Sequence, residues 1–468
     1  MNYEPSSPLV SRLPPGLHVF FTPRQTGPEP NVCDALRQLF SPDLKCHSVH
    51  QSFSSPPILS GRFSSAATYQ YYQPLPSILH FQTWLAKEFC PGEFVGRCPN
   101  EAASLAYASY VDIDFDAISH AVTATAVWRA GIAPKAGVDH LRAEKVKDGD
   151  RLEVGVLMPE KPGDDEPESL KLGGWLAVAG EDDHASKYRY AKPINPRADD
   201  VSEPTVFSFP SRHHPLPRAN PLTFTSSFNQ PTGLHPEIVL SFPSQHLKPP
   251  KDEPSCALHT YLTLPSALFL DQYQLEDPAL LAANNLIAIR SLSGEQDLEA
   301  PDWVVTQWGS AALIELASPP TETANTWNVT IPTHLRYLRS PETENGSAIH
   351  HVDLHLPVPI VFWACKAEEG LKMSVNPFDR VNLGYDGLFG PKTMFYHVPA
   401  ASPTDADASP FLGLELKVPV METRWGGIVQ AGTLVTVVVG FLMVAVGLFR
   451  GLGGETNRRK GSKGAKKA

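Results

Sequence analysis

An uncharged stretch near the carboxyl end constrains this chain more than any other feature. Residues 425–449 are 25 consecutive residues, between Arg424 and Arg450, without a charged side chain. At about 1.5 Å per residue, a helix of this length is roughly 37 Å long and crosses a hydrocarbon core of about 30 Å with some tilt. Such a helix also satisfies its own backbone hydrogen bonds, as lipid requires. A core helix of a soluble protein seldom runs this far without a charge, so the sequence predicts a single transmembrane helix over 425–449.

The charges on either side of this helix predict its orientation. The tail, residues 450–468, holds seven Lys and Arg residues against one Glu, a net charge of +6. The whole chain carries −11, so residues 1–449 carry −17. Because basic flanks stay on the cytosolic side, we expect a cytosolic tail and an acidic bulk on the lumenal or extracellular side.

The amino terminus leaves an alternative open. Its best apolar stretch, Leu17–Phe21, is too short for a signal peptide. Either the late helix exports the amino-terminal bulk, or the protein is tail-anchored and faces the cytosol. The second arrangement is disfavoured because the basic tail would then have to cross the membrane.

Two residue types agree with a lumenal bulk. Asn328-Val-Thr and Asn345-Gly-Ser are acceptor motifs for N-glycosylation, and both precede the membrane helix. The six cysteines precede it as well; they are Cys33, Cys46, Cys90, Cys98, Cys256 and Cys365. An even number suits disulfides, and free thiols in a core are the alternative.

Proline content predicts the fold class. The chain has 46 prolines in 468 residues, about twice the usual share of roughly 5%. Proline disfavours long soluble helices and favours short strands with irregular connections. We therefore predict a mainly β, antiparallel, sandwich-like ectodomain, which two β-rich domains could build. Residues 1–230 form its less regular amino-terminal region and residues 231–420 a β domain, followed by the helix at 425–449 and the tail at 450–468.

Several elements are predicted from local patterns. Residues 31–40 and 77–89 are typical of short amphipathic helices, and 151–160, 304–317 and 326–332 of strands.

The clearest strand pattern covers residues 351–363. Apolar and polar residues alternate there, which predicts a strand with one buried face. Because Pro357 and Pro359 deny ladder hydrogen bonds, we expect the later part of this strand at a sheet edge.

Catalytic constellations are weak in this sequence. His350, His351, Asp353 and His355 could suggest a metal site, but three or four ligands must converge, so a polar outer strand face is favoured. The sequence holds no G-x-S-x-G motif and no glycine-rich phosphate loop after a strand. We expect no metal, no cofactor and no nucleic-acid partner.

The acidic residues of segment 297–302 are a second weak candidate for a catalytic site. Asp297, Glu299 and Asp302 could act as paired carboxylates, but nothing in the sequence sets their separation, so an acidic turn is favoured.

The membrane helix itself offers a contact face. Gly432, Thr436 and Gly440 are spaced four residues apart and so lie on one side of the helix. Small residues let helix backbones approach closely in lipid, although glycine is also ordinary in such helices.

Five separated motifs resemble those of a known family, the PIG-X family in its fungal, Pbn-type form. They are CALHTYLTLPSALFLDQYQL (256–275), DLEAPDWVVTQWGS (297–310), IPTHLRYL (331–338), PVPIVFWAC (357–365) and NPFDRVNLGYDGLFG (376–390). The resemblance covers roughly 235–450, and it rests on the order of the motifs ahead of a single carboxyl-terminal span.

The resemblance implies a function. Members of this family are non-catalytic partners of the endoplasmic-reticulum enzyme that adds the first mannose to the glycosylphosphatidylinositol (GPI) precursor. A multi-spanning PIG-M-type subunit carries out the transfer, and the PIG-X subunit stabilises it. The ectodomain is then lumenal, β-rich and glycosylated. The tail departs from a dilysine retrieval signal, because only Lys466 is correctly placed, so retention is expected to come from the partner.

Two alternatives stay open beside this function. One is a general folding helper of the endoplasmic reticulum with several clients. The other, less favoured, is a membrane-anchored glycosyl enzyme that uses carboxylates such as Asp297 and Glu299.

The matched motifs also nominate individual residues. Cys256 and Cys365 are expected to approach within bonding distance. His334 and Arg336 are candidate partner contacts, with an exposed Arg336 gripping acidic or carbonyl groups. The favoured alternative is an internal ion pair of Arg336 with Asp271 or Glu299.

Overall fold

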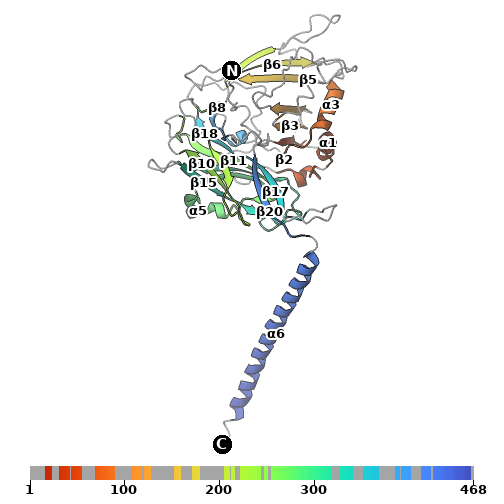
Figure 1. The fold of residues 1–468 in the computed structure, drawn as a ribbon, viewed down its shortest axis with the longest axis vertical. Helices are drawn as coiled ribbons and strands as arrows, with labels where there is room; N and C mark the ends of the chain where they lie inside the picture. The colour runs from red at the N-terminus through yellow and green to blue at the C-terminus, as the bar shows by residue number, and fades with distance from the viewer. Residues whose placement is uncertain are drawn as a thin grey trace. The chain divides into compact units, whose positions relative to one another are not determined.

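The structure of this chain is a computed structural model, shown in Figure 1. It describes residues 16–23, 31–42, 44–54, 69–89, 108, 110–117, 121–127, 152–159, 171–179, 205–210, 212–216, 222–243, 247–250, 255–318, 326–340, 351–367, 385–390, 392–401, 413–422 and 425–464. The chain divides into two units, one of Met1–Tyr337 with His355–Glu415 and one of Leu338–Leu354 with Leu416–Ala468.

Strands dominate the described residues ahead of the carboxyl-terminal helix. A four-stranded sheet has the order β2-β1-β3-β4, with β1 (Leu17–Thr22), β2 (Tyr69–Gln73), β3 (Tyr110–Asp116) and β4 (Ala121–Val127). A six-stranded sheet has the order β13-β14-β11-β18-β19-β8, with β8 (His213–Pro215), β11 (Ala257–Pro265), β13 (Leu286–Gly294), β14 (Gly309–Leu316), β18 (Ile360–Lys366) and β19 (Thr393–Val398).

Smaller sheets and helices complete the described part. The small sheets are β5-β6-β7 (Leu152–Pro159, Lys171–Ala179, Thr205–Pro210), β15-β10-β9 (Thr326–Pro332, Glu237–Pro243, Thr225–Phe228), β12-β16 (Leu268–Phe269, His334–Leu335) and β17-β20 (His351–Pro357, Gly413–Pro419). The helices are α1 (Val32–Leu39), α2 (Val49–Ser52), α3 (Leu79–Phe89), α5 (Pro278–Ala283) and α6 (Gly426–Gly464), with 3₁₀ turns η5 (Gln274–Glu276) and η6 (Asp386–Leu388). The predicted fold class, mainly β with one carboxyl-terminal apolar helix, is confirmed.

The local predictions hold where periodicity is strong. Helix α1 begins where the side chain of Asn31 accepts the backbone N–H of Asp34, an N-cap that satisfies one free donor. Its buried face is Val32, Cys33 and Leu36, at the spacing expected of an amphipathic helix. Helix α3 and strands β5 and β15 lie within the ranges predicted for them.

The strand predicted over 351–363 is two strands. Strand β17 shows the expected alternation, with its polar residues exposed and Leu356 buried. The chain then turns, and β18 is buried on both faces between β11 and β19. The prediction of a sheet edge for this later part is therefore wrong. Pro357 ends β17 and Pro359 lies in the connection, so neither interrupts a central ladder.

One hydrophobic core joins the amino-terminal region to the carboxyl-terminal strands. The indole of Trp308, just before β14, donates to the carbonyl of Gln70 on β2 at 3.0 Å. The same ring lies 5.6 Å from that of Tyr72, edge-on. Strand β8, which precedes residue 231, pairs in parallel with β19. The described parts of residues 1–230 and 231–420 thus share buried surface.

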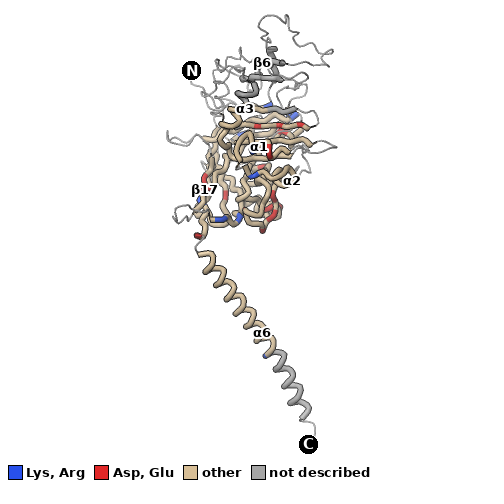
Figure 2. Tube along the Cα trace, turned by 90° about the vertical axis from the view of Figure 1, so that its right-hand side faces the viewer, with Lys and Arg blue, Asp and Glu red and all other residues tan. Residues whose placement is uncertain are grey.

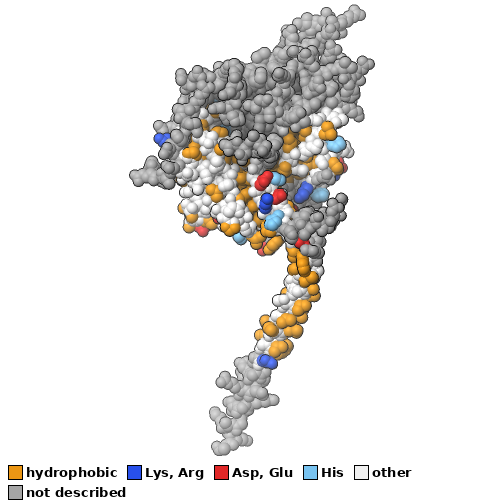
Figure 3. Space-filling view, in the orientation of Figure 1, with side chains coloured by type: hydrophobic (Ala, Val, Ile, Leu, Met, Phe, Trp, Pro, Cys, Tyr) orange, Lys and Arg blue, Asp and Glu red, His pale blue; other side chains and the backbone are white. Residues whose placement is uncertain are grey.

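Helix α6 is the feature that the uncharged stretch predicts. Its segment Gly426–Arg450 is long and apolar enough to cross a membrane, alone among the helices of the described residues. Figure 2 shows no charged residue along its first turns, and Figure 3 shows apolar side chains along the face of this segment that is in view. Exposed apolar residues line this segment along its length; Ile428 near its start is 63% exposed and Phe449 near its end is 75% exposed. Such a surface needs lipid or protein around it.

Candidate partner-contact surface

Three of the matched motif segments come together in space. Strand β12 pairs antiparallel with β16, which places Leu268 opposite Leu335 and Phe269 opposite His334. The backbone N–H of Asp302 donates to the carbonyl of Tyr337 at 3.1 Å. The segments around 268–275, 297–304 and 331–337 therefore form one site, although the sequence separates them by more than twenty residues each.

Arg336 lies beneath this site. It is 4% exposed, with its guanidinium 4.4 Å from the centre of the Phe269 ring. One guanidinium N–H donates to the carbonyl of Ala300 at 2.8 Å, and its backbone N–H donates to Ala267 at 2.9 Å. Exposure of Arg336 is therefore the wrong prediction, because the 295–302 loop covers the side chain.

The internal ion pair expected of Arg336 takes a different form. Neither Asp271 nor Glu299 lies within ion-pair distance of it in the described part of the chain. Burial lowers the pKa of Arg336, and the nearby carboxylates Glu295, Asp297 and Asp302 raise it again. The loop thus surrounds a buried cation with several negative charges rather than with a single partner.

The acidic loop forms a turn, as the favoured expectation has it. The Asp297 carboxylate accepts the backbone N–H groups of Glu299 at 2.8 Å and Ala300 at 3.0 Å, and these bonds lower the pKa of Asp297. Asp302 accepts the hydroxyl of Ser266 at 2.5 Å and lies 3.8 Å from the Lys45 ammonium. These carboxylates are occupied in shaping the loop.

Apolar side chains project from this loop. Trp303 is 46% exposed, Val304 59% and Tyr337 68%. The backbone N–H of Val304 donates to the carbonyl of Pro301 at 3.0 Å, closing a turn that presents both loop residues. We call Trp303, Val304 and Tyr337 the aromatic surface.

His334, three residues before Tyr337 in the chain, has both ring nitrogens engaged. Nε2 lies 2.8 Å from the side-chain oxygen of Gln274, and Nδ1 lies 2.9 Å from Nδ1 of His235. Burial and the neighbouring His235 lower the pKa of His334. The imidazole of His334 therefore links η5 to β16.

A buried polar cluster escaped the sequence analysis. His213 on β8 lies 2.9 Å from His397 on β19 and 3.0 Å from the carboxylate of Asp386. The hydroxyl of Tyr385 lies 3.1 Å from His397. All four are buried, and burial holds the pKa of His397 well below its usual value. Asp386 and Tyr385 fall within a quoted motif, but no sequence signal linked them to the two histidines.

No metal site emerges from the described residues. Among them, no group of three or more His, Cys, Asp or Glu side chains is arranged to hold a metal ion. His351, Asp353 and His355 lie on the exposed face of β17, as expected of a polar outer face. His350 lies outside the described residues.

The cysteines ahead of the helix pair where they are described. Cys256 and Cys365 are bonded to each other, and so are Cys33 and Cys46. The pairing of β11 with β18, which sets Ala257 opposite Ala364, brings the first two together. Cys90 and Cys98 lie outside the described residues.

The glycosylation candidates differ in what the structure shows. Asn328 is exposed on β15, the edge strand of its three-stranded sheet. Asn345 lies outside the described residues.

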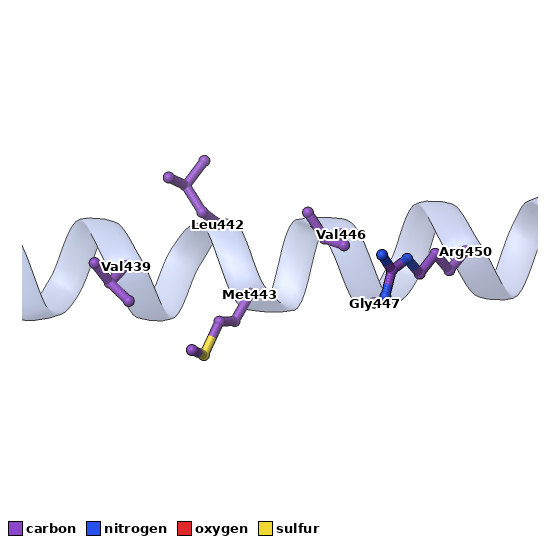
Figure 4. A pocket seen from close by; sticks show the side chains of 6 residues that line it. All are labelled: Val439, Leu442, Met443, Val446, Gly447 and Arg450. Carbon is purple, nitrogen blue, oxygen red and sulfur yellow. The ribbon is translucent and has the colours of Figure 1, made fainter.

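The small residues of α6 face open space. Apart from the nearby backbone of α6 itself, no described residue lies within 4 Å of a Cβ added at Gly432 or Gly440. The hydroxyl of Thr436 donates to the carbonyl of Gly432 at 2.9 Å, within the helix. Further along, Gly447 leaves a shallow depression between the side chains of Met443 and Arg450 (Figure 4).

Known proteins resemble this chain over most of its length. The profile of the family described as PIG-X / PBN1 matches residues 231–449. "Protein pbn1" of Emericella nidulans is 43% identical over 464 residues, which cover 94% of this chain and 81% of that protein. "Protein pbn1" of Neurospora crassa is 40% identical, covering 96% and 81%. "Protein PBN1" of Candida albicans is 24% identical, covering 71% and 69%. The chain therefore belongs to the PIG-X / PBN1 family, a family of accessory subunits in GPI-anchor biosynthesis.

Proposed function

We propose that this protein is the non-catalytic subunit that stabilises the multi-spanning, PIG-M-type catalytic subunit of GPI mannosyltransferase I. The observation that carries the proposal is family membership, with a match that runs through the carboxyl-terminal strands and on into the membrane helix. The enzyme that it serves adds the first mannose to the GPI-anchor precursor.

The mechanism is thermodynamic linkage. A subunit that binds only the folded state of the catalytic subunit lowers the free energy of that state by mass action. At a free concentration one hundred times the dissociation constant, the stabilisation is about 2.7 kcal/mol. No catalytic group on this chain is required.

Charge and cysteine chemistry support a lumenal position for the bulk of the chain. The basic tail favours a cytosolic carboxyl end, and the described disulfides ahead of α6 are typical of an oxidising compartment. We place the bulk of the chain in the lumen of the endoplasmic reticulum, with Asn328 and Asn345 as glycan acceptors. Protease added to sealed microsomes should digest only the tail, whereas digestion of the bulk with a protected tail would contradict this orientation.

The membrane helix contributes a second contact. Gly432, Thr436 and Gly440 form a face on which a helix of the catalytic subunit can approach closely. The Thr436 hydroxyl is bonded within α6, so this contact rests on packing rather than on a polar bridge.

Depletion of the protein in a fungal cell tests the main proposal. The abundance of the catalytic subunit should fall, and precursor without mannose should accumulate. An unrelated membrane protein of the endoplasmic reticulum is the control and should keep its level. Normal catalytic-subunit abundance with lost transfer would point to a direct catalytic contribution instead.

The two alternatives give different outcomes. A general folding helper would lose many clients upon depletion and would co-purify with several of them. A carboxylate enzyme would lose activity in an Asp297→Ala variant while the complex stayed intact. The hydrogen bonds by which Asp297 shapes its own turn do not favour the folding helper or the carboxylate enzyme.

A further inference from the structure

We infer that the aromatic surface, Trp303, Val304 and Tyr337, is the docking site for a cationic, apolar segment of a partner polypeptide. The inference rests on the proposed function, in which that segment belongs to the lumenal side of the mannosyltransferase catalytic subunit. It adds a location and a chemistry that family membership does not supply.

The apolar side chains are presented by an ordered scaffold. The turn closed between Pro301 and Val304 presents Trp303, and the backbone bond from Asp302 to Tyr337 holds the two segments that carry these side chains together. Interface hot spots are enriched in Trp and Tyr, because each supplies a large area. With only two rotatable bonds, each also loses little conformational entropy on binding.

The support beneath the surface is unusually polar. Arg336 is buried under the loop, bonded to Ala300 and stacked on Phe269. Its Nε and one terminal nitrogen have no hydrogen-bond partner in the described structure. A buried cation with unfilled donors is costly unless carboxylates surround it, and here the acidic loop does so. The attraction between Arg336 and the carboxylates of the 295–302 loop holds this loop in place. The turn that follows it can therefore keep Trp303 and Val304 exposed in a fixed position.

Charge identifies the kind of partner. Segments 266–280 and 295–304 contain seven carboxylates and no Lys or Arg. Of the described cations, Lys45 lies beside Asp302, and Arg336 and Arg339 lie in segment 331–340; the two acidic segments and these three cations together carry −4. The net charge of −4 favours a partner segment that carries Lys or Arg next to apolar residues.

The same charge argues against a lipid surface as the occupant. Trp and Tyr are common at membrane interfaces, but anionic headgroups attract basic clusters and are repelled by acidic ones. A polypeptide with basic residues is therefore the occupant that the surface fits.

Site-specific photo-crosslinking in membranes tests the inference with the full-length chain. A photoreactive amino acid is placed at Trp303 or at Tyr337, and in separate chains at the control positions Leu79 and Ile287, which are 63% and 46% exposed. Mass spectrometry then identifies the crosslinked peptide. We expect the two surface positions to capture one lumenal segment of the catalytic subunit, rich in Lys or Arg and apolar residues, and the control positions to capture none of it.

Variants supply a second readout. Trp303→Ala with Tyr337→Ala should reduce co-purification of the catalytic subunit at least tenfold, whereas Leu79→Ala with Ile287→Ala should leave it unchanged. Asp297→Asn keeps the oxygen that caps the turn but removes its charge, and should weaken the dependence of co-purification on salt. Correct folding of each variant is checked by protection of the Cys256–Cys365 disulfide from reduction.

The outcomes separate this inference from the proposed function. If the wild-type chain co-purifies the catalytic subunit while crosslinks at 303 and 337 reach only lipid or solvent, the docking surface is wrong and the proposed function stands. Unchanged co-purification by the double aromatic variant overturns the surface in the same way. If the wild-type chain never co-purifies the catalytic subunit, both proposals fall.

Discussion

Removal of the Cys256–Cys365 disulfide is the perturbation whose size the structure defines best. The bond joins residues 109 apart, whereas Cys33–Cys46 joins residues 13 apart. In the chain-entropy description, stabilisation grows with the logarithm of loop length. Paired alanine substitutions are then expected to cost about 4.8 kcal/mol for the long loop and about 3 kcal/mol for the short one. Alanine is the right replacement because it leaves no buried hydroxyl without a partner.

The assay is guanidinium unfolding of the full-length chain in detergent. Fluorescence follows the buried indoles of Trp308 and Trp363, which are 8% and 1% exposed. The two double variants serve as controls for each other, since each removes one bond between buried or half-buried cysteines. A larger loss of unfolding free energy for the Cys33–Cys46 pair, or equal losses, would refute the argument from loop length.

Four further predictions concern other residues of the chain. Arg336→Met should cost about 1–3 kcal/mol because Ala300 loses its donor, and should raise proteolysis within the 297–304 loop. Folding lowers the pKa of His397, so below the ordinary value of about 6.5 the unfolded state binds more protons. Stability should then fall with decreasing pH by up to about 1.4 kcal/mol per unit, and His397→Gln should flatten this slope in unfolding measured between pH 7 and 5. Asn328→Gln should remove one glycosidase-sensitive step in gel mobility. Gly440→Ile should reduce co-purification of the catalytic subunit without changing the unfolding of the ectodomain.

Local patterns predicted the candidate site only in part. An acidic turn at Asp297 was expected because nothing in the sequence defines the distance between the carboxylates. In the structure, the Asp297 carboxylate accepts hydrogen bonds from two backbone N–H groups. An internal Arg336 was the favoured alternative, but its predicted ion-pair partners were wrong, because alternation says which side chains share a face and not which segment covers that face. Coverage by Ala300, 36 positions away in the sequence, is decided by tertiary packing.

The prediction over 351–363 was wrong for a related reason. The sequence analysis extended the period-two alternation of β17 past Pro357 and Pro359, so residues 351–363 were predicted to form one half-buried strand. The chain instead uses the prolines to leave one sheet and enter another, where β18 is buried on both faces. A strand buried on both faces is apolar throughout and carries no alternation from which its position could be predicted.

The sequence by itself determined the membrane helix, the mainly β class and the family, because composition, the length of an uncharged stretch and the order of motifs are properties of the chain alone. Tertiary structure decided which distant residues meet. His213 and His397 are 184 positions apart, and Asp302 and Tyr337 lie on separate segments, yet strand pairing and loop packing bring each pair into contact. Such contacts depend on the whole fold, because the free-energy cost of closing each long loop is offset only by the interactions of the core that forms around it.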